Sequence, residues 1–243
     1  MHLVNTDDFE TVKGKYIDVI ENTPDIEKYA RWIYGKHPTD ESLKAYIDRG
    51  EMYVLTDGEE IAGMAAVALC QGDDYLNISW EKDLPNDEVA TVHLLAVCPD
   101  HRGKALGIKI LEEAMGIAVR NGKKALRLDA LKSNLPAQKM YEKAGFTYRG
   151  EQRLYAKNTG MTDFLYYEKK GSIIFFVGLT MPRYRFSMPS VSLDMNPKQC
   201  FRGSIPTATN SRTARPRHRS IAWESCQGQA FTGVLVVPLR LGI

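Results

Sequence analysis

A short basic stretch flanked by glycines, HRGKALGIK at positions 101–109, stands between an apolar run and a helix-like pattern. The N-terminus of a helix leaves its first backbone N–H groups unpaired and carries partial positive charge. Gly103 and Gly107 lack a Cβ, so an anion can approach the backbone closely, and Arg102 and Lys104 add full positive charges. Together these residues predict a site for a phosphate or pyrophosphate.

Two common phosphate loops do not fit this stretch. Gly103 and Gly107 are not followed by the Gly-Lys-Ser/Thr of a P-loop, and the chain has no GxGxxG at this point. The other interpretation is a tight turn from strand to helix with solvated charges. Short glycine motifs match by chance often enough that the loop alone does not separate the two interpretations.

The elements on both sides of this loop follow from periodicity and turn residues. We expect helices at the start, a hairpin with its turn at Asp57-Gly58, and then alternating strands and helices. This order predicts an α/β (α+β) three-layer domain over residues 1–170. The expected helices are about 7–22, 23–34, 39–49, 106–121 and 134–144, and the expected strands are 52–55, 61–69, 90–97, 126–130, 146–154 and 161–169.

Two segments carry recognisable motifs: LLAVCPDHRGKALG at positions 94–107 and NLPAQKMYEKAGF at 134–146. The first resembles motif A of the GNAT family of N-acetyltransferases, and the second resembles the Asn-x-x-Ala-x-x-x-Tyr-x-x-x-Gly-Phe of its motif B. The resemblance extends from about Met52 to Lys169. It implies a GNAT-like three-layer fold with a central mixed, mostly antiparallel sheet flanked by helices. Ala105 departs from the glycine most frequent at its position, which narrows the clearance for a ligand.

The resemblance implies that the ligand is acetyl-CoA, used as a cosubstrate. The backbone N–H groups of the loop would hold its pyrophosphate, and the edge of the preceding strand would pair with the pantetheine arm as an added strand does. A backbone N–H near Leu95 would polarise the thioester carbonyl. The cofactor-binding residues expected on this basis are Leu95, Ala96, Val97, Arg102, Gly103, Lys104, Ala105, Leu106, Gly107, Ile108 and Asn134.

Three residues are candidates for proton transfer. Tyr141 shares a helix face with Asn134, and in the family the matching Tyr protonates the departing thiolate; ordinary helix–sheet packing is the other interpretation. An amine acceptor arrives protonated, so a base must take its proton. His93 is the first candidate, because an imidazole with its ordinary pKa of about 6.5 accepts a proton near neutral pH. Glu88 is the second, although an acidic loop is more often solvated surface.

The net charge of the chain differs between the residues before and after position 170. Residues 171–243 contain nine Lys+Arg and two Asp+Glu, a net charge of +7, which leaves 23 basic and 28 acidic side chains for residues 1–170, a net charge of −5. Proline, serine and arginine dominate the tail without a sustained period. We expect 171–243 to be largely disordered; a translated non-homologous stretch, a nucleic-acid-binding arm and a degenerate domain remain open interpretations.

The sequence thus predicts an enzyme that transfers acetyl from acetyl-CoA to a primary amine, on a small molecule or peptide, by direct attack. A non-catalytic acyl-CoA-binding regulatory module and a protein that binds nucleic acid through its tail are the alternatives. Neither a metal site nor a membrane partner is expected, and a homodimer stays open. Four cysteines without zinc spacing and a start unlike a signal peptide predict free thiols in the cytoplasm.

Overall fold

The computed structural model of the 243-residue chain describes residues 1–156 and 160–171. The expected disorder of the tail therefore concerns residues that lie almost wholly outside the described ranges. Three single 3-10 turns, at Asp73–Tyr75, Asn86–Glu88 and Pro99–His101, interrupt the loops. The helices and strands are β1 (Leu3–Asn5), α1 (Phe9–Glu21), α2 (Ile26–Ala30), α3 (Asp40–Asp48), β2 (Met52–Asp57), β3 (Glu60–Ala68), β4 (Val89–Val97), α4 (Leu106–Arg120), β5 (Ala125–Leu131), α5 (Leu135–Lys143), β6 (Thr147–Ala156) and β7 (Gly160–Lys170).

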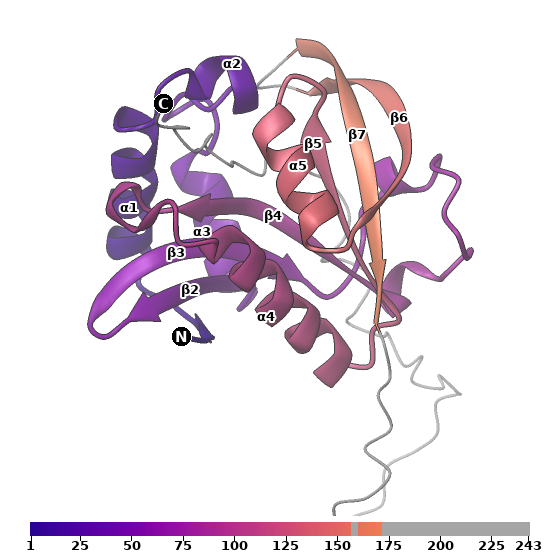
Figure 1. Ribbon diagram of the computed structural model, residues 1–243, viewed down its shortest axis with the longest axis horizontal. Coiled ribbons are helices and arrows are strands. Elements are labelled where there is room, and N and C mark those ends of the chain that lie inside the picture. The colour runs from indigo at the N-terminus through magenta and orange to yellow at the C-terminus, as the bar shows by residue number, and fades with distance from the viewer. Residues whose placement is uncertain (157–159, 172–243) are drawn as a thin grey trace, which may run out of the picture. The chain divides into compact units, whose positions relative to one another are not determined.

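The strands form one seven-stranded sheet in the order β1-β2-β3-β4-β5-β7-β6. Every neighbouring pair is antiparallel except β4 and β5, which are parallel. Parallel neighbours need a crossover connection, and α4 supplies it. Figure 1 shows β4 and β5 near the centre of the sheet, with β6 and β7 closing it on one side. The expected mixed, mostly antiparallel sheet is confirmed.

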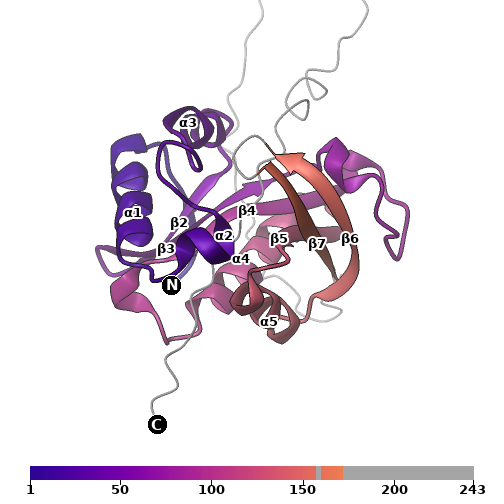
Figure 2. The same cartoon turned by 90° about the horizontal axis from the view of Figure 1, so that it is seen from above.

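Helices cover both faces of the sheet, which gives the three layers expected. One hydrophobic cluster joins α4 and α5 to the sheet, and it contains Ile110, Leu111 and Tyr141. A second cluster joins α1 and α3 to the other face, and it contains Tyr16 and Leu43. Figure 2 shows α1 and α3 on the opposite side of the sheet from α4 and α5.

Local signals place most of the boundaries. Thr39 caps α3 in a capping box with Ser42, as its hydroxyl accepts from the Ser42 N–H at 3.2 Å. The second expected helix was wrong in length: α2 ends at Ala30, because Arg31 adopts a left-handed conformation with φ 54°. The short strand β1 was not expected at all, since three residues carry too little pattern to read.

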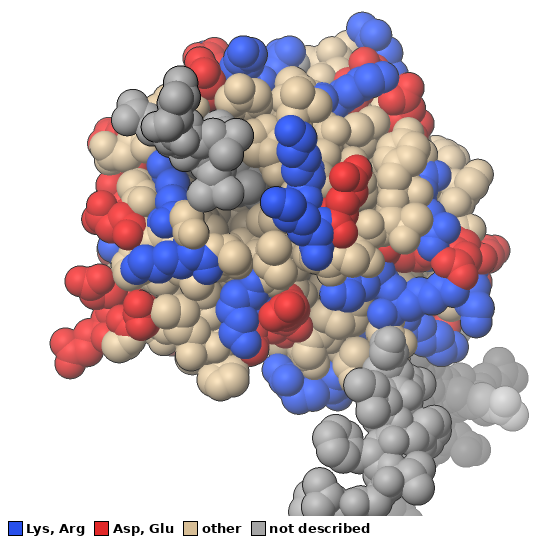
Figure 3. Space-filling view, viewed as in Figure 1, with Lys and Arg blue, Asp and Glu red and all other residues tan. Residues whose placement is uncertain are grey.

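The described surface carries charges of both signs. Figure 3 shows Lys and Arg side chains interspersed with Asp and Glu over the face that bears α4 and α5. None of the described helices is long and apolar enough to cross a membrane. The expectation of free thiols is confirmed for Cys98, which is buried and free, but it is wrong for Cys70, which is disulfide-bonded.

Candidate active site

The loop that leads into α4 presents a run of free backbone donors. The N–H of Arg102 bonds the Pro99 carbonyl at 3.3 Å, and the N–H of Ile108 bonds the Ala105 carbonyl at 3.0 Å. Between them, within the described part of the chain, the N–H groups of residues 103–107 have no protein acceptor. Five successive donors at a helix N-terminus fit an anion, so the anion site stays a prediction; the N–H groups of Arg102 and Ile108 are already bonded within the protein.

Left-handed backbone shapes this loop. Gly103 has φ 81° and Ala105, the N-cap of α4, has φ 55°. Glycine adopts such a conformation without steric cost, whereas alanine pays about 1–2 kcal/mol. Ala105 therefore adopts a backbone conformation that favours glycine, and the loop keeps its shape despite the methyl group.

The two basic side chains of the loop have different surroundings. The guanidinium of Arg102 donates to the Asn22 carbonyl at 2.9 Å and also to the Thr23 hydroxyl. Arg102 thus ties the connection between α1 and α2 to the loop, which is a structural role the sequence did not reveal. Lys104 is exposed and remains the cation nearest to the free N–H groups in sequence.

Gly107 lies against α5, where a side chain would meet Met140. A Cβ at this position would lie 2.3 Å from the Sδ of Met140 in α5. Another glycine of α4, Gly116, has only the flexible tip of Arg120 near its Cβ position, at 3.2 Å. The missing side chain at Gly107 therefore lets α4 and α5 approach one another.

Because the two glycines of α4 have different surroundings, alanine substitutions at them should change the stability of the protein in opposite directions. We expect Gly107→Ala to lower the free energy of unfolding by about 1–3 kcal/mol, because Met140 must move in a packed core. Gly116→Ala, the matched control, should raise it by about 0.5–1 kcal/mol, because alanine favours the helix. Urea unfolding of both variants measures the two effects; equal stabilisation by both would contradict the contact.

The strands β4 and β5 pair only over their first residues. Val89, Ala90 and Thr91 align with residues 125–127, and beyond this point the two strands separate (Figure 1). The edge of β4 from Val92 to Val97 therefore has no partner strand on the β5 side in the described part of the chain. Leu95, Ala96 and Val97 lie within this unpaired edge, where the sequence placed the pantetheine arm.

A β-bulge interrupts β4 at the same place. Met64 aligns with Ala96 and Ala66 with His93, so one residue of β3 faces both Leu94 and Leu95. Leu94 has φ 53°, and its carbonyl accepts from the buried Tyr16 hydroxyl at 2.6 Å. A bulge bends the strand and redirects its backbone groups, and Tyr16 of α1 holds this one in position.

The bulge reverses which face the later residues of β4 occupy. Regular strand alternation would place His93 on the same face as Leu95 and Val97, and the structure does not. Leu95 belongs to the cluster under α4 and Val97 packs against that cluster, whereas the ring of His93 stacks on Tyr46 of α3 with centroids 6.0 Å apart. The extra residue of a bulge shifts the alternation by one, and no strand pattern in the sequence marks it.

Tyr141 of α5 is fully buried, and its hydroxyl has no hydrogen-bond partner in the described part of the chain. Burial, and then the nearby Asp129 carboxyl, raises the pKa of this phenol well above its usual value, so it keeps its proton. Asn134, expected to bind the cofactor, caps α5 through its Oδ1, which accepts from the Ala137 N–H at 3.2 Å.

A family model described as the acetyltransferase (GNAT) family matches residues 20–146, which is more than half of the chain. The chain belongs to the GNAT acetyltransferase family. The fold that contains the free N–H groups before α4, the separated strands and Tyr141 is therefore that of the GNAT family.

Individual relatives agree with this assignment. The GNAT chain is 23% identical over 117 residues to an uncharacterized N-acetyltransferase of Archaeoglobus fulgidus, a match that spans 48% of this chain and 66%, just under two thirds, of the relative. A Streptococcus agalactiae acetyltransferase of the GNAT family is similar in structure, with a TM-score of 0.55, 18% identity and coverage of 70% of this chain and 94% of that one. The Salmonella typhimurium protein yncA, solved with its cofactor acetyl-CoA, has a TM-score of 0.50 and 17% identity, with coverage of 70% of this chain and 94% of that one. At these identities the two structures show the fold.

The sequence did not reveal Asp129 as a candidate for the site of this GNAT protein. Its side chain lies in β5, 1% exposed, where it accepts from the Tyr75 hydroxyl at 2.6 Å. Its second oxygen, Oδ2, has no partner among the described residues. Burial raises the pKa of this carboxyl to about 8. A single acid within the apolar strand ALRLDAL was the one available signal.

His93 and Asp129 approach each other through Tyr75. The Tyr75 ring lies edge-on to His93, with centroids 6.3 Å apart, and its hydroxyl bonds Asp129. The Nε2 of His93 lies 3.0 Å from the Thr91 hydroxyl. His93 and Asp129 therefore contact the same residue, Tyr75, and the ring of His93 stacks on Tyr46 of α3.

Glu88, the second base candidate, lies elsewhere. It precedes Leu95 by roughly 20 Å of extended strand. Its carboxylate pairs with Lys124 at the end where β4 and β5 are joined. The structure brings Tyr141, His93 and Asp129 toward the separated strands, and it leaves Glu88 apart from them.

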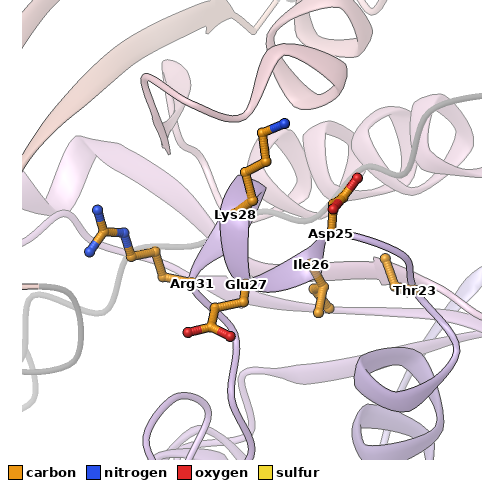
Figure 4. Close-up of a pocket in the computed structure, with 6 residues that line it drawn as sticks. All are labelled: Thr23, Asp25, Ile26, Glu27, Lys28 and Arg31. Carbon is orange, nitrogen blue, oxygen red and sulfur yellow. The ribbon is translucent and has the colours of Figure 1, made fainter.

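A pocket of about 650 Å³ lies at α2, and Figure 4 shows side chains that extend from the helix in different directions around it. Thr23 belongs to this pocket and bonds Arg102 of the loop. The carbonyl of Tyr29 accepts from Ser133, which precedes α5. The segment that lines the pocket thus contacts both the loop before α4 and the residue that precedes α5. It is lined by Thr23, Asp25, Ile26, Glu27, Lys28 and Arg31.

No group of three or more His, Cys, Asp or Glu within residues 1–156 and 160–171 is placed to hold a metal ion. Two aromatic residues, Tyr75 and Trp80, lie near the site, with ring centroids 6.0 Å apart. Trp32 instead packs edge-on to Tyr16, at 5.7 Å.

Proposed function

We propose that this protein is an N-acetyltransferase that moves acetyl from acetyl-CoA to a primary amine by direct attack. The observation that carries the proposal is the run of five free N–H groups before α4 beside the unpaired edge of β4. The first fits a pyrophosphate and the second fits an extended arm. Lys104 adds charge at the loop, and Asn134 fixes the helix that carries Tyr141.

In the proposed reaction the amine nitrogen forms a bond to the acetyl carbon while the carbon–sulfur bond breaks. Acetyl-CoA supplies the thioester, and the chain supplies proton transfer. Tyr141 gives its proton to the departing thiolate. Asp129, with a pKa near 8, takes the proton that the amine loses, and His93 relays it outward. This assignment favours Asp129 and His93 over Glu88.

Binding is tested with the full chain. We expect acetyl-CoA at 100 times its Kd to stabilise the protein by about 2.7 kcal/mol and to raise Tm by about 5–10 °C. Acetyl-pantetheine, the matched control, lacks the pyrophosphate and should give a much smaller shift. Differential scanning fluorimetry measures both; equal shifts would exclude the loop as the pyrophosphate site.

Turnover is tested by thiol release from acetyl-CoA with a panel of primary amines, including a peptide with a free N-terminus. We expect stoichiometric CoA and N-acetyl product. Binding of acetyl-CoA without release of thiol in the presence of any amine would contradict the enzyme and favour a regulatory module.

A further inference from the structure

Buried acceptor atoms without partners gather on one face of β5 and β7. Asp129 and Tyr166 are aligned neighbours in this antiparallel pair, which places their side chains next to each other. The Oδ2 of Asp129 and the hydroxyl of Tyr166 are buried, and neither has a hydrogen-bond partner in the described part of the chain. An unsatisfied buried polar group costs about 1–3 kcal/mol, so these atoms indicate a ligand that donates hydrogen bonds.

Aromatic rings surround these atoms. Tyr75 packs edge-on to Tyr166 at 5.3 Å and parallel to Trp80 at 6.0 Å. We call Tyr46, Tyr75, Trp80, His93 and Tyr166 the aromatic cluster. Ring faces attract an ammonium group and also cover an apolar body, so the cluster favours a ligand with both.

A second carboxyl lies at the cluster. Asp74 is half-buried beside Tyr75 in the 3-10 turn, and burial raises its pKa to about 6. After burial, its charge raises the pKa of Asp129, and both carboxyls raise that of Tyr166. A bound ammonium group would stabilise the ionised forms of these two carboxyl groups, which burial disfavours.

The cations next to the cluster already have counter-ions. Arg127 lies over the Trp80 ring at 3.9 Å, and its guanidinium pairs with the buried Glu168 at 2.9 Å. Arg49 lies over the Tyr46 ring at 4.9 Å and pairs with Glu51 at 2.7 Å. Neither of these two arginines is left to bind an acidic group of a substrate.

We propose that the aromatic cluster, with Asp74 and Asp129, binds the acceptor, and that this acceptor is a primary amine on an apolar body without a carboxylate or phosphate. The proposal rests on the proposed function for the transfer itself. The ammonium group of the acceptor donates to Asp129 Oδ2 and to the Tyr166 hydroxyl, and its apolar body lies against the rings. An acidic substituent on the acceptor would face only the carboxyl groups of Asp74 and Asp129.

A matched pair of amines tests the substrate class. 2-Phenylethylamine and L-phenylalanine differ only in the carboxylate. We expect thiol release to favour 2-phenylethylamine by at least about 100-fold in kcat/KM, because like charges placed together cost several kcal/mol. An L-phenylalanine rate equal to or above that of 2-phenylethylamine would overturn the proposal while leaving acetyl transfer intact.

Binding without acetyl-CoA separates the two proposals. Titration calorimetry of the full chain with 2-phenylethylamine should show about a tenfold weaker Kd in Asp74→Asn, since about 1.4 kcal/mol is tenfold in affinity. Asp87→Asn, which removes an exposed charge from another 3-10 turn, Asn86–Glu88, should change Kd less than about twofold.

The outcomes are distinct. Amine binding that depends on Asp74, without thiol release, would support the acceptor site and contradict the transferase. Thiol release with other amines, without measurable binding of 2-phenylethylamine, would overturn the acceptor site alone. An equal Kd in Asp74→Asn and wild type would also overturn it.

Discussion

Tyr141→Phe should lower kcat by about 10²–10³-fold while leaving the affinity for acetyl-CoA unchanged. The variant removes the one proton that the proposed reaction gives to the thiolate, and positioned proton transfer contributes on this scale. The same change should leave stability equal or raise it by about 1 kcal/mol, because the Tyr141 hydroxyl is buried without a partner. Loss of rate with gain of stability is the result expected of a functional group that folding does not need.

Three measurements make this test: single-turnover thiol release, acetyl-CoA titration and urea unfolding. Tyr148→Phe is the matched control, since that side chain is 48% exposed and should change none of the three values. A wild-type rate in Tyr141→Phe would show that this phenol only packs against the sheet. A large loss of stability would instead show that its hydroxyl has a partner.

Asp129→Asn should lower kcat/KM by about 10²-fold or more, because the amide cannot take a proton. The hydrogen bond from Tyr75 is kept, since Asn also offers an oxygen to it. In the wild type a base must be ionised to act, so activity should rise with pH through about 8, and this rise should be absent in the variant. The increase near the pKa of the amine itself, about 10, should remain in both.

Stability should change with pH in a defined direction. The pKa of Asp129 is raised from 3.8 to about 8 on folding, so between these values the folded state binds the proton that the unfolded state has lost. Wild-type stability therefore falls as the pH rises from about 4 to 8, relative to Asp129→Asn, which does not titrate. Unfolding at several pH values measures the difference.

Asp163→Asn is the control for this residue, because its carboxyl lies on the neighbouring strand β7 and is 38% exposed. It should follow the wild type in rate and in pH dependence. If Asp129→Asn also follows the wild type from pH 6 to 9, the carboxyl is not the base, and His93→Ala becomes the deciding variant.

Local patterns predicted much of this molecule. The hairpin at Asp57-Gly58, the cap of α3 at Thr39 and the helix from Asn134 were all confirmed, because turn and capping chemistry act between residues close in the chain. The loop before α4 was predicted for the same reason. Two motifs in the right order then indicated the GNAT family, and the family match confirmed it.

Tertiary structure decided where the residues of those motifs lie and what they contact. The bulge at Leu94 moved His93 away from the face of Leu95, Met140 filled the space beside Gly107, and Arg102 bonded Thr23 far away in the sequence. Each depends on contacts between distant segments, which no spacing in the chain encodes. Asp129 shows this most clearly: the sequence gives only an acid in a strand, whereas burial raises its pKa to about 8, which is why we propose it as the base.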